Sequence, residues 1–290
     1  MKLSGIIKDG ELVSEKEWIK HIDSLREKGT ATKEELKEKI IEAVRKRLPD
    51  KRFGILFSGG IDSSLIALIC KKLRADFICY SIGYGNADDI MWANKVSARR
   101  KFKLKKRILE FYEAENYIKK TAKLLGEIER PVVHVGVGTV FMAAADLAKE
   151  DNVDIFFSGL GSEEIFAGYE RHEKSKDINE ECWFGLKRMI QGDLKRDYLI
   201  GKEKKIEILT PFLDADVIRT AMKIPGNEKI KGEHKKVILR EIAEELGLQR
   251  EFAWRKKKAA QYGSRIDKAI GKLAGKQQKG EYLRELIFQK

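Results

Sequence analysis

Residues Phe53 to Ile69 read FGILFSGGIDSSLIALI, and this stretch decides the fold. The run from Phe53 to Phe57 is short and apolar, which is typical of a strand buried inside a parallel sheet. Leu65 to Ile69 supply the apolar residues of a helix that follows. A helix that begins directly after a strand leaves backbone N–H groups unpaired at its positive end, where an anion binds. The stretch therefore predicts a strand, a phosphate-binding loop and a helix.

The loop SGGIDSS has the residue types that a phosphate site needs. Gly59 and Gly60 let a phosphate approach the backbone, and hydroxyl donors come from Ser58, Ser63 and Ser64. Asp62 would repel an anion unless a bound Mg²⁺ bridges its carboxylate to phosphate oxygens. Because no lysine follows Gly60, the loop differs from the familiar ATPase loop. An ordinary strand-to-helix turn capped by Asp62 or Ser63 is the less favoured alternative.

The same string resembles the pyrophosphate loop of the N-type ATP pyrophosphatases. These enzymes cut ATP between its α and β phosphates and pass AMP to an acceptor. The resemblance implies ATP and Mg²⁺ as the ligands of this loop.

The bulk composition fits a globular protein with a heavily charged surface. Hydrophobic residues make up 42% of the 290 residues and charged residues 36%, which is enough for one large or two small domains. No apolar run approaches the roughly 20 residues of a membrane span, and the N-terminal residues MKLSGIIKDG lack a signal-peptide core. We therefore expect a cytoplasmic protein without a membrane partner. Cys70, Cys79 and Cys182 are too scattered for disulfides or a zinc site and are expected to be buried.

The net charge of +13 has several interpretations. It is compatible with nucleic-acid binding, with polyanionic substrates and with the Lys- and Glu-rich surface of a thermophile's protein. Lysines often alternate with glutamates, as in the segment Lys33 to Lys39, which is typical of a solvated helix face. No known nucleic-acid-binding motif accompanies the charge, so a nucleic-acid partner is not favoured.

Strands and helices alternate along the first part of the chain, which predicts a parallel α/β sheet with ligands at the carboxyl ends of its strands. The expected strands are a pair around the Asp9-Gly10 turn and then residues 53–57, 76–82, 103–109 and 153–157. The expected helices are residues 15–28, 32–48 with Thr32 and Glu35 as a capping box, 86–100, 113–125 and 139–149. From Ser162 onward the pattern is mostly helical.

A second glycine-rich turn, SGLGSEEIFAGY over Ser158 to Tyr169, follows the apolar run Ile155 to Phe157. Its glycines permit close approach to a nucleotide, and Glu163 is placed to share a cation with Asp62. Glu163 and Glu164 could equally be ordinary first-turn acids of a helix. The presence of SGGIDSS favours the functional interpretation.

Three later motifs complete a family pattern: TPFLD at 210–214, KVILRE at 236–241 and WRKK at 254–257. With SGLGSEEIFAGY they resemble, in order and spacing, the synthetase domain of asparagine synthetases. The resemblance covers about Lys33 to Ser264 and implies a mostly parallel five-stranded sheet flanked by helices, as in the adenine-nucleotide α-hydrolase-like fold. We therefore divide the chain into a leader (1–32), an ATP pyrophosphatase domain (33–264) and a basic, helical C-terminal tail (265–290).

The resemblance also implies roles for individual positions. The pyrophosphate loop is Ser58, Gly59, Gly60, Asp62, Ser63 and Ser64, and the adenosine is lined by Phe57, Ile82, Ser158 and Gly159. Asp62 and Glu163 match the metal-binding acids, although the family usually has Asp at the second position. Lys236 matches a lysine that contacts the phosphates and the intermediate, with Lys235 leaving a one-residue ambiguity. Arg255 and Lys257 match a basic pair near the pyrophosphate. Catalysis is thus assigned to Lys236, Asp62, Arg255 and Lys257.

The sequence departs from the family at three places. Lys2 follows Met1 where the glutaminase nucleophile would be a cysteine, so we expect ammonia as the nitrogen donor, free or from a separate glutaminase subunit. Leu160 replaces a Glu, or the Tyr of lactam-forming relatives, and cannot transfer a proton. The stretch 132–138, VVHVGVG, lacks the Thr and Arg that would hold an amino-acid carboxylate. Within it, His134 could be a substrate contact or base, but a core or turn histidine is favoured.

These observations predict an ATP- and Mg²⁺-dependent ligase that forms an adenylate on a small-molecule acceptor, releases pyrophosphate and joins the acceptor to ammonia. The family suggests asparagine synthesis, against which the acceptor stretch argues. One alternative is the same chemistry on another acceptor, such as a tRNA base or another small carboxylate. A second is a non-catalytic, ATP-binding regulatory protein, for which Leu160 is the best argument. A homodimer remains open.

Overall fold

The computed structural model describes residues 6–8, 10–256 and 259–288. Its centre is a five-stranded sheet in the order β5-β4-β3-β6-β7. The strands are β3 (Phe53–Leu56), β4 (Phe77–Tyr84), β5 (Leu104–Leu109), β6 (Ile155–Phe157) and β7 (Glu207–Leu209). All neighbouring pairs are parallel, which confirms the predicted fold class. The chain builds outward from β3 in both directions, so a crevice forms where β3 and β6 end.

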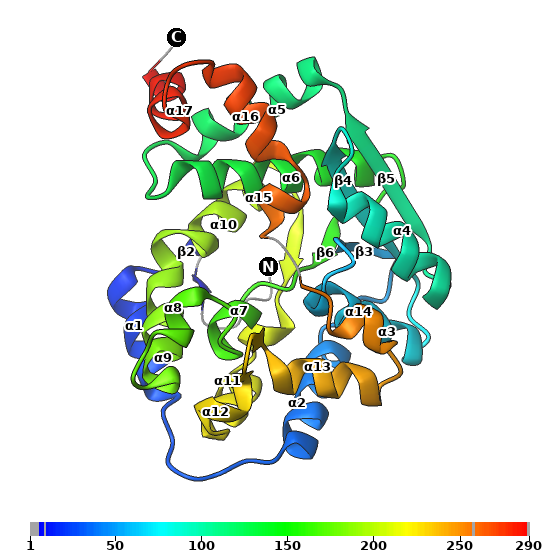
Figure 1. Cartoon of the computed structure of the whole chain (residues 1–290), viewed down its shortest axis with the longest axis vertical. Helices are drawn as coiled ribbons and strands as arrows, with labels where there is room; N and C mark the ends of the chain where they lie inside the picture. The colour runs from blue at the N-terminus through cyan, green and yellow to red at the C-terminus, as the bar shows by residue number, and fades with distance from the viewer. Residues whose placement is uncertain (1–5, 9, 257–258, 289–290) are drawn as a thin grey trace.

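Helices cover both faces of the sheet (Figure 1). One face carries α2 (Lys33–Arg45), α3 (Ile61–Lys72), α4 (Asp88–Arg100), α11 (Ala215–Lys223) and α13 (Val237–Glu245). The other carries α5 (Phe111–Leu125), α6 (Pro131–Lys149), α10 (Asp193–Lys204), α16 (Ile266–Ala274) and α17 (Lys279–Phe288). Each face packs its own apolar cluster, because alternate residues of a buried strand point to opposite sides.

Short elements connect these layers. They are α7 (Ser162–Ile165), α8 (Glu170–Glu173), α9 (Ile178–Arg188), α12 (Gly226–Lys229), α14 (Arg250–Ala253), α15 (Ala260–Gly263) and the 3₁₀ turns η1 (Met189–Gln191) and η2 (Pro211–Leu213). Two small antiparallel pairs join β1 (Ile7–Lys8) to β2 (Glu11–Leu12) and β8 (Ile230–Lys231) to β9 (His234–Lys235). The predicted strand pair around Asp9-Gly10 is present, although Asp9 itself lies outside the described residues.

One expectation about the elements was wrong, and one strand was missed. The helix expected from Thr139 begins at Pro131, so the stretch 132–138 forms the first turns of α6 and is not a loop. Valine and glycine are weak helix formers, but close packing overrides this: a Cβ on Gly136 would lie 2.7 Å from the Cβ of Gln261. The short strand β7 was not located from the sequence, because three residues give too little alternation to detect.

Several local predictions hold. Thr32 and Glu35 form the capping box at the start of α2, with Glu35 N–H donating to Thr32 Oγ1 and Thr32 N–H to Glu35 Oε2. The three cysteines are buried and free. Helix α1 (Glu15–Ser24) packs against α9, and the Trp18 indole donates to the Leu186 carbonyl at 2.8 Å. The division into leader, domain and tail stays a prediction.

Helix α6 has the length and hydropathy that would allow it to cross a membrane. It is the one such helix among the described residues, and 72% of its apolar window is buried inside the fold. It packs against β4, α5 and α10, so its apolar residues form part of the core of the fold.

Candidate active site

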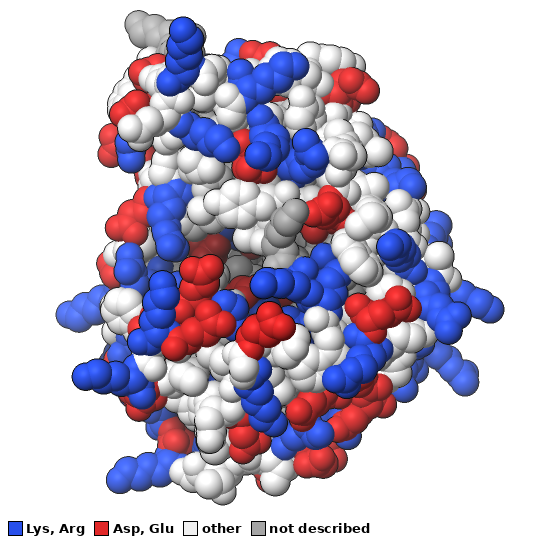
Figure 2. Space-filling model, viewed as in Figure 1, with Lys and Arg blue, Asp and Glu red and all other residues white. Residues whose placement is uncertain are grey.

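The carboxyl ends of β3, β4 and β6 open into a cavity of about 730 Å³. Figure 2 shows this face of the molecule hollowed near its centre, with acidic and basic side chains around the opening. One part of the cavity is lined by residues that the sequence assigned to ATP: Phe57, Ser58, Asp62, Ser63, Ile82, Ser158, Gly159 and Glu163. Most of the remaining lining comes from α6, α7, α8, α10 and α15. We call these parts the nucleotide half and the acceptor half.

The loop between β3 and α3 has the shape of an anion cradle. Gly59 has φ of +62°, and a Cβ there would lie 2.7 Å from the carbonyl carbon of Trp92, so only glycine fits. Gly60 caps α3 without a side-chain hydrogen bond, and its N–H lies 3.3 Å from Ser58 Oγ. The Ser64 hydroxyl is buried and has no hydrogen-bond partner within the described part of the chain. Of the loop's serines, Ser58 and Ser63 line the cavity beside the N-terminus of α3, and Ser64 is not among the described lining residues.

A single ammonium joins the two glycine-rich turns. The Nζ of Lys236 lies 2.8 Å from Asp62 Oδ1, 2.8 Å from Glu163 Oε1 and 3.1 Å from Ser162 Oγ. Burial disfavours the charged lysine, but the two carboxylates outweigh this effect and the pKa of Lys236 is raised. Lys236 is therefore a fixed positive charge at the end of β3 and β6.

The two adjacent lysines point in different directions. Lys235 is directed away from this cluster and pairs with Glu173 at 2.9 Å. Lys236 adopts a left-handed conformation with φ of 56° at the start of α13, which turns its side chain toward Asp62. The sequence expectation selected the lysine that reaches the cavity acids.

Asp62 and Glu163 have the chemistry of a Mg²⁺ site. Both offer hard carboxylate oxygens, and they come close enough for one ammonium to contact both. Among the described residues no group of three or more His, Cys, Asp or Glu could hold a metal. Mg²⁺ is usually bound by one or two carboxylates together with phosphate oxygens of a nucleotide, and the two carboxylates of Asp62 and Glu163 suit that arrangement.

Arg255 lies behind the loop. Its Nη2 donates to the Ser58 carbonyl at 3.3 Å, and its guanidinium stacks 4.9 Å from the Trp92 ring. Its position is fixed by Arg240, a residue whose role the sequence did not reveal. Arg240 donates to the carbonyls of Lys235 at 2.7 Å and Arg255 at 3.2 Å. Lys257, the other predicted basic residue, lies outside the described residues.

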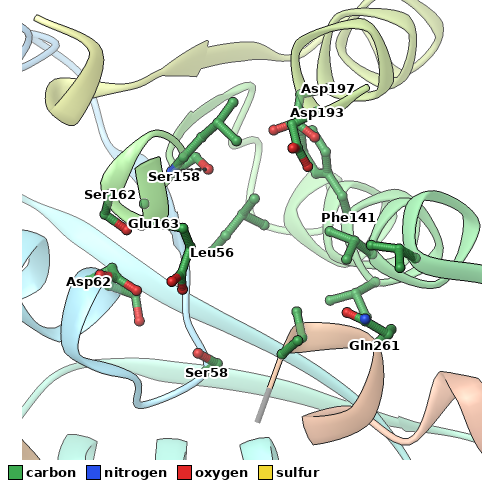
Figure 3. A pocket seen from close by; sticks show the side chains of 18 of the residues that line it. Leu56, Ser58, Asp62, Phe141, Ser158, Ser162, Glu163, Asp193, Asp197 and Gln261 are labelled. Atoms are coloured by element: carbon green, nitrogen blue, oxygen red, sulfur yellow. Dashed lines mark hydrogen bonds between the residues drawn. The ribbon is translucent and has the colours of Figure 1, made fainter. Parts of the chain in front are cut away.

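The acceptor half has an apolar wall and an acidic end. Val133, Val137, Val140, Phe141 and Ala144 of α6 form the wall. In Figure 3, Asp193 and Asp197 of α10 lie across the cavity from Asp62 and Glu163. Arg196 donates to both α10 carboxylates, at 2.7 Å each. These residues were missed, since the topology and not a local motif brings them to the cavity.

His134 is a core histidine, the interpretation that the sequence favoured. It is buried, and its Nδ1 lies 3.5 Å from Arg196 Nη1. Burial lowers its pKa to about 4, so the ring is neutral. The cavity lining does not include it among the described residues.

Glu164 is the most deeply buried acid of the cavity lining, with 3% of its surface exposed. The Tyr169 hydroxyl donates to Glu164 Oε1 at 3.0 Å. Burial raises the pKa of Glu164 to about 7, with Asp193 and Glu163 adding to the effect. Leu160 also lines the cavity and packs against the apolar core.

The family model for asparagine synthase matches residues 35–180 and 172–288 of this chain. The chain belongs to the asparagine synthase family. A Methanocaldococcus jannaschii protein described as "Putative asparagine synthetase (glutamine-hydrolyzing) 1" is 31% identical over 279 residues, covering 83% of this chain and 50% of that protein. The Gallus gallus asparagine synthetase is 30% identical over 229 residues, covering 75% and 41%.

The chain therefore spans half or less of the length of these two curated relatives. Among solved structures, the NMN synthetase from Francisella tularensis aligns over 89% of this chain and 93% of its own, with a TM-score of 0.46 and 15% identity.

Proposed function

We propose that this chain is an ATP- and Mg²⁺-dependent ligase that activates an acceptor carboxylate as an adenylate, releases pyrophosphate and joins the acyl group to nitrogen. The observation that carries the proposal is the Lys236 ammonium, bound to Asp62 and Glu163 beside a glycine loop at the end of a parallel sheet. Family membership supports it.

Each residue of the nucleotide half has a role in this chemistry. The loop from Ser58 to Ser64 binds the phosphates through backbone N–H and hydroxyl groups. Asp62 and Glu163 would hold Mg²⁺, which offsets the negative charge of the pyrophosphate. Lys236 and Arg255 supply preorganised positive charge where negative charge develops on the leaving group. Phe57 and Ile82 provide apolar surface for the adenosine.

Ammonia is the simplest nitrogen source, free or delivered by a glutaminase on another chain. The relatives' names describe glutamine hydrolysis, and a glutaminase would supply the same ammonia. Aspartate is the first acceptor to test because of the family. The acceptor half argues for testing others, since Arg196 is already engaged by Asp193 and Asp197 and these acids disfavour a second carboxylate.

The test is pyrophosphate release from ATP and Mg²⁺. The reactions contain ammonia with aspartate, or ammonia with the small-molecule fraction of a cell extract. Asp62→Ala removes one acid of the cluster while Glu163 still pairs with Lys236, and Asp50→Ala is the matched control at an exposed position. We expect release that Asp62→Ala abolishes and Asp50→Ala leaves intact. If neither the wild type nor Asp62→Ala releases pyrophosphate although both still bind ATP, the ligase function is contradicted.

ATP binding without pyrophosphate release would favour the second candidate, a nucleotide-binding regulatory protein. The observation behind it is Leu160, an apolar residue on the cavity wall where the family places a polar one. A tRNA acceptor is tested in the same series of reactions by varying the salt concentration. Binding of tRNA would weaken steeply as the salt concentration rises.

A further inference from the structure

One side of α16 is basic, and the proposed ligase chemistry does not use it. Lys268 and Lys272 are four residues apart and therefore lie on the same side of the helix, and Arg265 directly precedes its start. Ile266 and Ile270 are buried on the opposite side. In Figure 2, basic side chains gather above the opening of the cavity, where Figure 1 places α16. The basic side of α16 thus faces solvent beside the cavity.

The partners found for these cations within the described residues are neutral groups. Arg265 donates to the side-chain oxygen of Asn86, and the Lys272 ammonium lies 3.9 Å from the centre of the Phe111 ring. The acid on the same helix, Asp267, is buried and lies 3.7 Å from Lys279. The positive charge on this side of α16 is therefore available to an anion.

Exposed tyrosines lie at the two ends of this basic surface. Tyr262 lines the cavity, and 49% of its surface is exposed. At the far end Tyr112, which follows Phe111, is 66% exposed. Tyr84 connects the two ends: its N–H donates to the Ser264 carbonyl at 2.8 Å, and its ring lies 6.4 Å from that of Phe111. We call this surface the α16 strip, and it comprises Tyr112, Tyr262, Arg265, Lys268 and Lys272.

The α16 strip has the chemistry that binds single-stranded nucleic acid. Unpaired bases stack on exposed aromatic rings, and lysine and arginine neutralise the phosphates between them. From Arg265 to Lys272 the chain rises about 10 Å along the helix axis, which is the length of about three stacked nucleotides. A protein partner fits less well, because the cores of protein interfaces are depleted of lysine. RNA is the expected nucleic acid, since its loops and ends present unpaired bases.

We propose that the α16 strip binds a single-stranded segment of RNA. A base stacks on Tyr112, the phosphates contact Lys268 and Lys272, and a second base stacks on Tyr262. Because Tyr262 also lines the cavity, the bound segment leads toward the acceptor half. This binding goes beyond the proposed ligase function and requires neither ATP nor its cleavage.

The test is fluorescence anisotropy of a labelled, unstructured RNA of about 12 nucleotides, titrated with the full chain in the absence of ATP. An RNA duplex of the same sequence is the second probe, and both are measured at 50 and 200 mM salt. The charge variant combines Lys268→Gln with Lys272→Gln. Its control combines Lys16→Gln with Lys20→Gln, two exposed lysines that are also four residues apart on a helix.

The aromatic variant is Tyr112→Ala. Its control is Phe184→Ala on α9, because Phe184 is 51% exposed and the Arg188 guanidinium lies 5.6 Å from the centre of its ring. The control thus removes an exposed ring beside a cation at another part of the surface. Circular dichroism checks that each variant is folded.

We expect the wild type to bind the single strand more tightly than the duplex. The two-lysine variant should bind the single strand about 10-fold more weakly at 50 mM salt, and its salt slope should be smaller by about 1.4, which is 0.7 for each lost phosphate contact. Tyr112→Ala should bind it about 10-fold more weakly with an unchanged salt slope, because stacking on the ring releases no counterions. Both controls should match the wild type.

Four results would overturn the proposal. The first is that the wild type binds no single-stranded RNA at 50 mM salt. The second is equal affinity for strand and duplex without an effect of Tyr112→Ala, which would mean attraction by charge alone. The third is an equal loss of affinity in the variants and their controls. The fourth is self-association of the wild type, measured by sedimentation, that Tyr112→Ala abolishes while RNA binding is unchanged. That result would assign the surface to a second copy of this chain.

The outcome is independent of the ligase function. RNA binding is measured without ATP, whereas the ligase function is judged by pyrophosphate release. Failure of one therefore leaves the other standing.

Discussion

At the scale of single residues, the proposed ligase function depends most on Lys236. Its left-handed backbone, with φ of 56°, costs about 1 kcal/mol for a residue with a Cβ. The ion pairs of its ammonium with Asp62 and Glu163 offset this conformational cost. The sequence motif left two neighbouring lysines as candidates for the one that contacts the phosphates. Only the three-dimensional structure distinguishes them, because both are ordinary lysines in a Lys-rich chain.

Replacing Lys236 with methionine tests this role. The variant keeps an unbranched side chain close in length to the lysine's carbon chain and removes the ammonium, so pyrophosphate release at saturating ATP should fall about 100-fold. Lys235→Met is the control and should stay close to wild type, since its ammonium pairs with Glu173 on the surface. Comparable rates for the two variants would show that the buried ammonium is not part of the reaction.

Lys229 offers a separate prediction about stability. Its side chain is fully buried, and the hydrogen bond found for its Nζ within the described residues goes to Met222 Sδ at 3.7 Å. Burial lowers its pKa from 10.5 to about 8. Below pH 8 the lysine is charged in both the folded and the unfolded protein, and the folded protein is destabilised by the full cost of burying the charged ammonium. Between pH 8 and 10.5 only the unfolded chain keeps the proton, so stability rises with pH.

Lys229→Met should therefore raise the free energy of unfolding by about 3 kcal/mol at neutral pH. The gain should shrink as the pH approaches 10.5, the ordinary value of the lysine. Urea unfolding of both proteins across this pH range measures it, with Lys20→Met as the exposed control. A gain that grows with pH would mean that the lysine is stabilised in the folded state.

At the scale of elements, the strand–loop–helix unit from β3 to α3 was predictable and the start of α6 was not. The first carries local signals, namely a short apolar run, two glycines and a helix start. Helix α6 begins with valines and glycines whose helical state depends on packing against α5 and α15. The acceptor half could not be predicted for the same reason, because packing brings together residues of α6, α7, α8, α10 and α15 to form it.

The loop itself gives a prediction with an internal control. Gly59 and Gly85 have similar positive φ, +62° and +58°, but only Gly59 has backbone atoms against its Cβ position. Gly85→Ala should lose about 1 kcal/mol of stability from its backbone conformation alone. Gly59→Ala should lose about 3 kcal/mol and bind ATP more weakly, because Trp92 must move.

Urea unfolding and calorimetric titration with ATP measure the two effects. Trp92 also supports Arg255, so its displacement should affect both sides of the nucleotide half. Equal stability losses in the two variants, with wild-type ATP affinity in both, would show that the loop tolerates a side chain at Gly59.

At the scale of the whole molecule, the site lies where segments distant in sequence meet. The nucleotide half joins the turn after β3 to the turn after β6 and to Lys236, and the motifs of the family mark all three. The net charge of +13 did not indicate this site. Many of the basic residues form surface ion pairs such as Lys33 with Glu245, and the acceptor half has acidic and basic side chains in similar number.

The proposed ligase function requires the chain to cut ATP between the α and β phosphates. The most direct test incubates the protein with ATP labelled at the α phosphate, Mg²⁺, ammonia and the acceptor, and then separates the labelled products. We expect labelled AMP in equal amount to pyrophosphate, with neither formed by Asp62→Ala. Labelled ADP as the product would contradict it, because the glycine loop and the Lys236 cluster would then be serving a different cleavage.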